Sequence, residues 1–235
     1  MQGIKTTARF AGLSSLLSVL GGVFAQGYIS RSLIDFSDPA ATATNILGHP
    51  DMLRLGFAVY MVEMACDIAK VALFYELLRP VNRSVNLVAA FLALAGCVIK
   101  AFSRVFFVVP LLVLDGGAPY LGVFSAPQLQ ALSLLLLRIN DRGAGTATIF
   151  YGFSTPLTGY LMLRSAFLPR FLGVLQVVCG LGWLTFLYPP LYRRLFPVIV
   201  GLALLGSAVL IFWLLVFGVD EEKWRKQAEI GQVEE

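Results

Sequence analysis

Residues 87–114 read LVAAFLALAGCVIKAFSRVFFVVPLLVL, an apolar run long enough to cross a lipid bilayer as one helix. The hydrocarbon core of a bilayer is about 30 Å thick, and about 20 apolar helical residues span it. Lys100 and Arg104 lie inside the run, where a charge is costly, and Pro110 predicts a kink near its end. The run therefore predicts a membrane-spanning helix that carries two cations.

Five more runs of this kind occur, at about residues 10–29, 53–78, 144–163, 167–187 and 196–219. The composition agrees: 58% of the 235 residues are hydrophobic, 14% are charged, and the mean hydropathy is +0.80. Soluble domains are about 45–50% apolar and about 25% charged. We predict an all-α, polytopic transmembrane bundle of six spanning helices over residues 1–219, followed by a polar cytoplasmic tail over residues 220–235.

The first run follows Lys5 and Arg9 and resembles a signal peptide, but its length predicts a retained helix. Residues 38–48 begin with Asp-Pro and end with Gly, which predicts a short interfacial helix with an aspartate cap. Residues 129–139 are apolar but too few to span, so we expect a second interfacial or re-entrant helix there, separate from residues 144–163.

Six spans place both chain ends on one side of the membrane, and the basic residues indicate which side. With the N-terminus inside, nine Lys and Arg residues lie on the cytoplasmic side and six outside. The inside set is Lys5, Arg9, Arg79, Arg83, Arg164, Arg170, Lys223, Arg225 and Lys226, and the outside set is Arg31, Arg54, Arg138, Arg142, Arg193 and Arg194. Cytoplasmic loops carry an excess of Lys and Arg. The pattern favours cytoplasmic termini.

Charged side chains also occur within the run at residues 53–78. Glu63, Asp67 and Lys70 are spaced i, i+4, i+7, so they share one face of a helix, and Tyr60 extends that face by a turn. A charge at the centre of a membrane helix costs about 2.5–3.5 kcal/mol on insertion scales. These groups must therefore face one another, water or the interior of the bundle.

The two charged runs are joined by a short polar turn, which we place near Arg83, so they should be antiparallel neighbours. Counted from that turn, Glu63 lies as far back along the chain as Arg104 lies forward, and Asp67 likewise matches Lys100. The sequence thus predicts two interhelical ion pairs, Glu63–Arg104 and Asp67–Lys100. It places no acid opposite Lys70, for which Asp67 and Glu76 are the candidate nearest acids.

Three functions are open for these charges. In the first, they form a site that binds or conducts a small ion or amphiphilic ligand, with the ligand-binding residues Tyr60, Glu63, Asp67, Lys70, Lys100 and Arg104. In the second, a buried carboxylic acid catalyses a reaction of a lipid or isoprenoid inside the membrane, although no catalytic residue is identified. In the third, the pairs only fix the register of a structural or partner-binding subunit. The lipid bilayer is the expected surrounding, and a homo-oligomer is left open.

The histidine, the cysteines and the uncharged polar residues give weaker indications of a functional site. His49 is the single histidine, and Cys66, Cys97 and Cys179 all lie in apolar runs, so no metal site, cofactor or disulfide framework is predicted. No basic tract indicates nucleic acid. Polar residues that are candidates to line the same site, or to bond to neighbouring backbone, are Gln26, Thr146, Thr148, Ser154, Thr155, Thr158 and Gln176.

Several short stretches are distinctive and occur in order along the chain, at residues 41–47, 54–57, 66–68, 78–84, 128–132, 159–161 and 167–170. Together they resemble the bacterial family labelled domain of unknown function 4386. The resemblance implies a bacterial inner-membrane protein with no assigned activity. Asp67 falls in a matching stretch, whereas Glu63, Lys70, Lys100 and Arg104 do not.

Overall fold

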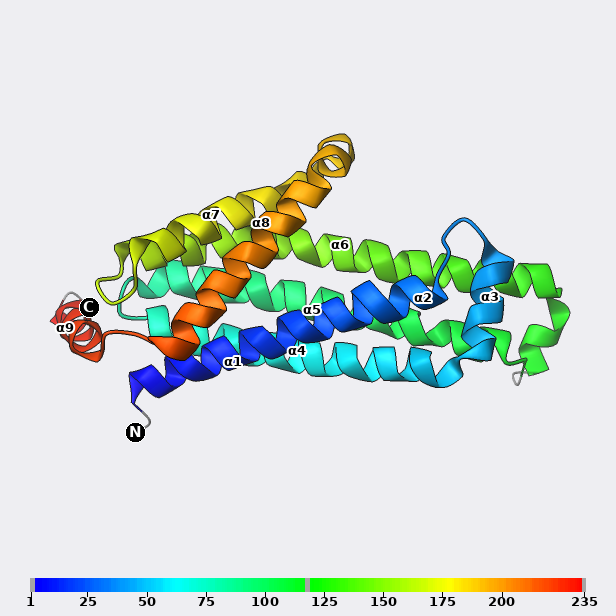
Figure 1. Cartoon of the computed structure of the whole chain (residues 1–235), viewed down its shortest axis with the longest axis horizontal. Coiled ribbons are helices and arrows are strands. Elements are labelled where there is room, and N and C mark those ends of the chain that lie inside the picture. The colour runs from blue at the N-terminus through cyan, green and yellow to red at the C-terminus, as the bar shows by residue number, and fades with distance from the viewer. Residues whose placement is uncertain (1–2, 117–118, 234–235) are drawn as a thin grey trace. The chain divides into compact units, whose positions relative to one another are not determined.

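A computed structural model describes residues 3–116 and 119–233, and over these ranges every regular element is a helix (Figure 1). This confirms the predicted all-α class. The elements, in chain order, are α1 Ile4–Gly22, the π-helix η1 Val23–Ser30, α2 Arg31–Leu33, α3 Pro39–Gly48, α4 Pro50–Leu78, α5 Arg83–Leu114, the 3₁₀ helix η2 Pro119–Val123, α6 Ala126–Arg164, α7 Arg170–Leu184, the 3₁₀ helix η3 Thr185–Leu187, α8 Pro189–Val216 and α9 Glu221–Val233.

Four helices of the described ranges are long and apolar enough to cross a membrane: Ile4–Leu33, Arg83–Leu114, Arg170–Leu187 and Pro189–Val216. The predicted number of six is not confirmed. The two remaining long helices are more polar, since α4 carries three charges within eight residues and the second half of α6 is rich in Gly, Ser and Thr. The four apolar helices suggest a membrane protein.

Helix α6 corrects one prediction. Residues 129–139 do not form a separate interfacial helix, because α6 continues from Ala126 to Arg164 over 39 residues, about 58 Å at the usual rise per residue. Gly143 lies inside this continuous helix and allows close packing, since a Cβ there would lie 2.5 Å from the Cβ of Ser103. Pro156 likewise lies within the continuous helix.

Helix α3 agrees with its prediction. The Asp38 carboxylate accepts hydrogen bonds from the backbone N–H groups of Ala40 and Ala41, both at 2.9 Å, and Pro39 occupies the first turn. These bonds satisfy amides that have no partner inside the helix. The helix ends at Gly48, as the sequence indicates.

The first of these candidate membrane helices contains an unusual segment. Residues Ile4–Leu33 form one helix of 30 residues, but its stretch Val23–Ser30 is a π-helix. π-Helical turns are rare and occur frequently at functional sites. Gln26 and Ser30 both lie in this segment.

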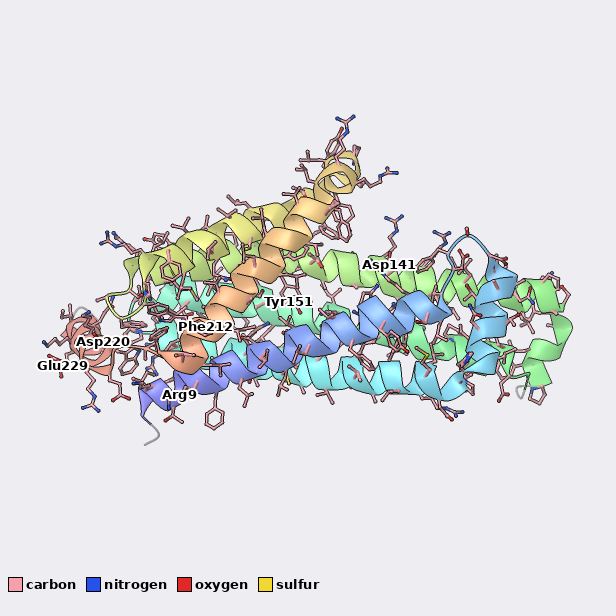
Figure 2. All side chains as sticks on the ribbon, viewed as in Figure 1. Arg9, Asp141, Tyr151, Phe212, Asp220 and Glu229 are labelled. Atoms are coloured by element: carbon pink, nitrogen blue, oxygen red, sulfur yellow. The ribbon has the colours of Figure 1, made fainter. Side chains whose placement is uncertain are left out.

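The chain forms two compact units, and α1, α4, α5 and α6 contribute residues to both. Unit 1 comprises Met1–Leu17, Cys66–Cys97 and Thr146–Glu235. Its core joins buried residues of α1, α4, α6, α7 and α8, and Trp224 of α9 packs against that core and donates its indole N–H to the Leu77 carbonyl at 2.8 Å. The polar tail is therefore docked on unit 1. Asp220, just before α9 (Figure 2), accepts a hydrogen bond from the Lys223 N–H, which holds the pKa of the Asp220 carboxyl below its usual range.

Helices α6 and α7 of unit 1 meet at glycines. A Cβ added to Gly159 would lie 2.7 Å from the Gly173 carbonyl oxygen, and one added to Gly173 would lie 2.7 Å from the Gly159 carbonyl oxygen. Gly180 lies equally close to Pro156, since its Cβ would be 2.3 Å from the proline Cδ. Small residues of this kind let membrane helices approach backbone to backbone.

Unit 2 comprises Ser18–Ala65 and Val98–Gly145. Its core is apolar apart from the hydroxyl of Tyr60, and its buried residues are Ala25, Ile29, Leu33, Ile46, Leu53, Tyr60, Phe107, Leu111 and Leu137. Gly56 allows tight packing here, because its Cβ would lie 2.9 Å from Ile29 and 3.1 Å from Phe107. The charged residues Glu63, Lys100 and Arg104 belong to this unit.

Candidate functional site

The central contact of the candidate site is a buried ion pair between α4 and α5. The Lys100 Nζ lies 2.6 Å from the Glu63 Oε1, and the two side chains are only 17% and 5% exposed. Gly22 of α1 leaves room for the carboxylate, since a Cβ at that position would lie 3.0 Å from the same Oε1. The opposite charges of the carboxylate and the ammonium lower the free-energy cost of burying each group.

This pairing corrects the predicted register. We expected Glu63 to face Arg104, but its partner is Lys100, one helical turn away. The turn between α4 and α5 is centred between Pro80 and Val81, about three residues before the predicted centre. A turn that comes three residues earlier moves the residue opposite Glu63 by about six positions, or about 9 Å. The predicted Asp67–Lys100 pair would join residues of different units and stays a prediction.

Arg104 is held by polar and aromatic groups instead. Its guanidinium carbon lies 3.7 Å from the centroid of the Tyr60 ring, a cation–π distance, and its Nη1 donates to the Asn140 Oδ1 at 3.1 Å. The side chain is 3% exposed. Asn140 belongs to α6, so α4, α5 and α6 all contribute to the position of this guanidinium.

The Tyr60 hydroxyl is fixed in turn by the π-helical segment. It donates to the Gln26 Oε1 at 2.7 Å and lies 3.1 Å from the Ser30 Oγ. Its ring also meets Phe107 edge to face, with centroids 5.2 Å apart. Tyr60 therefore connects the π-helix on one side with Arg104 on the other, and its ring orientation is set at both ends.

Two buried atoms of this cluster have no hydrogen-bond partner among the described residues, the Oε2 of Glu63 and the Nε of Arg104. They belong to oppositely charged groups, each of which is already engaged through another atom. A third such atom is the Ser133 Oγ, on the same face of α6 as Asn140 and two turns before it. Buried polar groups nearly always have a partner, so these exceptions mark the cluster as incompletely satisfied.

Asp67 and Lys70 form a second pair, in unit 1. The Lys70 Nζ lies 2.5 Å from the Asp67 Oδ1, which confirms Asp67 as the nearest acid. The aspartate side chain is 5% exposed, whereas the lysine side chain is 33% exposed. The two residues are three positions apart on α4, so this pair does not connect two helices.

The structure brings some of the weaker candidates to the cluster and not others. Gln26 contacts Tyr60, as above, whereas Ser154 donates to the Ala89 carbonyl and Thr158 donates to the Ser154 carbonyl. The latter two therefore satisfy backbone oxygens in unit 1. Sequence reasoning missed Asn140, because the polar stretch around it resembled a loop. The sequence feature that could have identified Asn140 is its position three residues after Leu137, on the same face of a helix.

No metal-binding group marks the described part of the site. No set of three His, Cys, Asp or Glu side chains among the described residues could hold a metal ion. A shallow cleft of about 210 Å³ is lined by Ser84, Val85, Val88 and Leu157, none of which is a predicted site residue. Asp141, the neighbour of Asn140 on α6 (Figure 2), is exposed.

A comparison with protein-family models matches residues 10–218 to the family described as domain of unknown function (DUF4386). This match covers most of the chain, from the first membrane helix to the end of α8. Comparisons with curated proteins and with solved structures gave no match.

Proposed function

Because this chain belongs to the DUF4386 family, whose description names no activity, we propose a function from its own residues. We propose a multi-pass membrane protein whose buried cluster of Tyr60, Glu63, Lys100 and Arg104 binds a small ion or amphiphilic ligand and conducts it across the bilayer. Charged groups inside membrane helices are costly and usually mark substrate paths or proton relays.

One observation carries this proposal: Glu63 and Arg104 are both buried and each keeps one polar atom without a partner among the described residues. A polar network in a low dielectric is expensive when only partly satisfied. A bound proton or ion at Glu63, or an anionic group at Arg104, would supply the missing partner. Asp67 and Lys70 remain candidates for the same function because they continue the charged face of α4.

We place the protein in the bacterial inner membrane with six spans and both termini in the cytoplasm, which the basic residues and the resemblance support. Fusions of alkaline phosphatase at the loop between Leu78 and Arg83 and after Leu114 test this placement. Six spans put the first fusion inside, where the phosphatase is inactive, and the second outside, where it is active. If only the four apolar helices cross, both results are reversed, which would contradict the six-span topology.

Conduction is tested with purified protein in liposomes that contain a pH-sensitive dye. Under an imposed pH gradient, we expect wild-type protein to dissipate the gradient at least several-fold faster than Glu63→Gln, because the amide cannot take up a proton at Oε2. The control is Glu76→Gln, the same change at an exposed position of the same helix. Equal rates for wild type, Glu63→Gln and protein-free liposomes would refute proton conduction.

A purely structural role is the second candidate, and the Glu63–Lys100 pair favours it, because one interhelical pair can fix the register of α4 against α5. In that case Glu63→Gln would lower stability without changing any flux. The intramembrane-enzyme hypothesis gains no support, since both buried carboxylates, Glu63 and Asp67, are bound by a lysine.

A further inference from the structure

We propose that Arg104 is the anion subsite of this cluster and that its ligand is a monovalent carboxylate, carried on a short apolar chain. This inference rests on the proposed function and deepens it by naming the class of ligand. It starts from a buried guanidinium that is fully oriented and yet incompletely bonded.

The contacts of Arg104 leave one edge of the guanidinium without a hydrogen-bond partner among the described residues. The Tyr60 ring covers one face of the guanidinium, at 3.7 Å, and Asn140 accepts from Nη1. The Nε, which lies on the other edge, is buried and has no partner among the described residues. A guanidinium that is locked in place by packing has already lost its rotational freedom, so a ligand need not fix it on binding.

The chemistry of that edge fits a carboxylate. Two parallel N–H groups of a guanidinium match the two oxygens of a planar carboxylate, which gives a bidentate, charge-assisted contact. The charge also fits, because Glu63, Lys100 and Arg104 together carry one negative and two positive charges, and a single anionic charge balances them. A phosphate would bring nearly two charges at neutral pH.

The surroundings fit an apolar chain attached to that carboxylate. Phe107 lies one turn after Arg104 on α5 and packs edge to face on the Tyr60 ring, and Leu111 follows one turn later in the same buried cluster. An apolar chain that extends from a carboxylate at Nε toward Phe107 and Leu111 would therefore meet aromatic and aliphatic side chains.

The test uses the thermal stability of the purified full-length chain in detergent. Sodium chloride, acetate and butyrate are titrated at equal ionic strength, so that screening is the same in each series. A ligand that binds only the folded state raises the melting temperature, and tenfold excess over Kd gives roughly 3–6 °C for a chain of this size. We expect this rise for wild type in butyrate relative to chloride.

Two variants and a control make the test specific. Arg104→Lys keeps the positive charge but loses the paired N–H donors of the guanidinium. Asn140→Asp places a carboxylate of the protein itself beside the guanidinium. Both variants should therefore reduce the butyrate-induced rise in melting temperature to below about 1 °C. Asn140→Asp nearly preserves side-chain volume, so it can test the Arg104 site even if Arg104→Lys does not fold. The control is Arg138→Lys, at an exposed arginine that donates to the Phe36 carbonyl and lies near that ring. It should keep the full shift.

The outcomes separate this inference from the proposed function. A larger shift with butyrate than with acetate supports an amphiphilic carboxylate, whereas equal shifts would refute the apolar chain. No difference between butyrate and chloride in wild type, or a shift that persists in both Arg104→Lys and Asn140→Asp, would overturn the carboxylate site. The proposed Glu63-dependent conduction would not be affected by that result. Conversely, a butyrate-induced rise in melting temperature that depends on Arg104, without any conduction, would indicate a binding protein that is not a transporter.

Discussion

Replacement of Gly159 by leucine is expected to abolish the packing of α6 on α7 and to lower the stability of the protein by more than about 3 kcal/mol. A Cβ at this position would lie 2.7 Å from the Gly173 carbonyl oxygen and 2.8 Å from the Val177 backbone nitrogen. Both are backbone atoms, so the overlap is relieved only if the two helices separate. The reciprocal contact at Gly173 means that its replacement should have a similar effect.

The measurement is the melting temperature and the yield of monodisperse protein after extraction in a mild detergent. The matched control is Gly201→Leu in the neighbouring helix α8, where nothing lies within 4 Å of an added Cβ. We expect Gly201→Leu to behave as wild type and Gly159→Leu to elute as aggregate. Equal melting temperatures for the two variants would show that α6 and α7 do not meet at these glycines.

The second large effect is expected at the buried ion pair. Glu63→Gln and Lys100→Met should each cost about 2–4 kcal/mol, because each removes one partner and leaves the other charge buried. The double variant should return to within about 1 kcal/mol of wild type, since no uncompensated charge of this pair remains. The cost of Lys100→Met should be the larger, because Glu63 already lacks a partner at Oε2.

A double-mutant cycle on thermal or denaturant stability provides the coupling energy. The exposed pair Asp51–Arg54, at 2.8 Å on the same helix α4, serves as the control and should show no resolvable coupling. A double variant that is as unstable as the worse single variant would mean that the two residues do not stabilise each other. The structural role of the pair would then be lost, and only the ligand-binding role would remain.

Much of the helical architecture was predictable because its signals are local. The apolar runs predicted the positions of α1, α4, α5, α7 and α8, and Asp38, Pro39 and Gly48 predicted both ends of α3. The burial of Glu63, Asp67 and Arg104 also followed from their position inside apolar runs. These predictions needed only the residue types and their spacing along one helix.

The pairing of the charges was not predictable to the same degree, because it depends on the exact centre of one turn. Moving that centre by three residues changed the partner of Glu63 from Arg104 to Lys100. The continuity of α6 was missed because residues 129–139 are too few to span a bilayer and polar residues separate them from the next apolar run. Both questions are settled by tertiary contacts, which a single sequence does not contain.

The π-helical segment Val23–Ser30 makes backbone geometry, as well as residue identity, critical at one point of the molecule. A π-turn holds one more residue than an α-turn, so it accommodates an extra residue without rotating the helix that follows. If the same residues were held in α-helical geometry, everything after them would rotate by about 100° relative to α1. Ser30 would then turn away from the Tyr60 hydroxyl although every side chain of the cluster was still encoded. The wide turn therefore sets how Tyr60 is held.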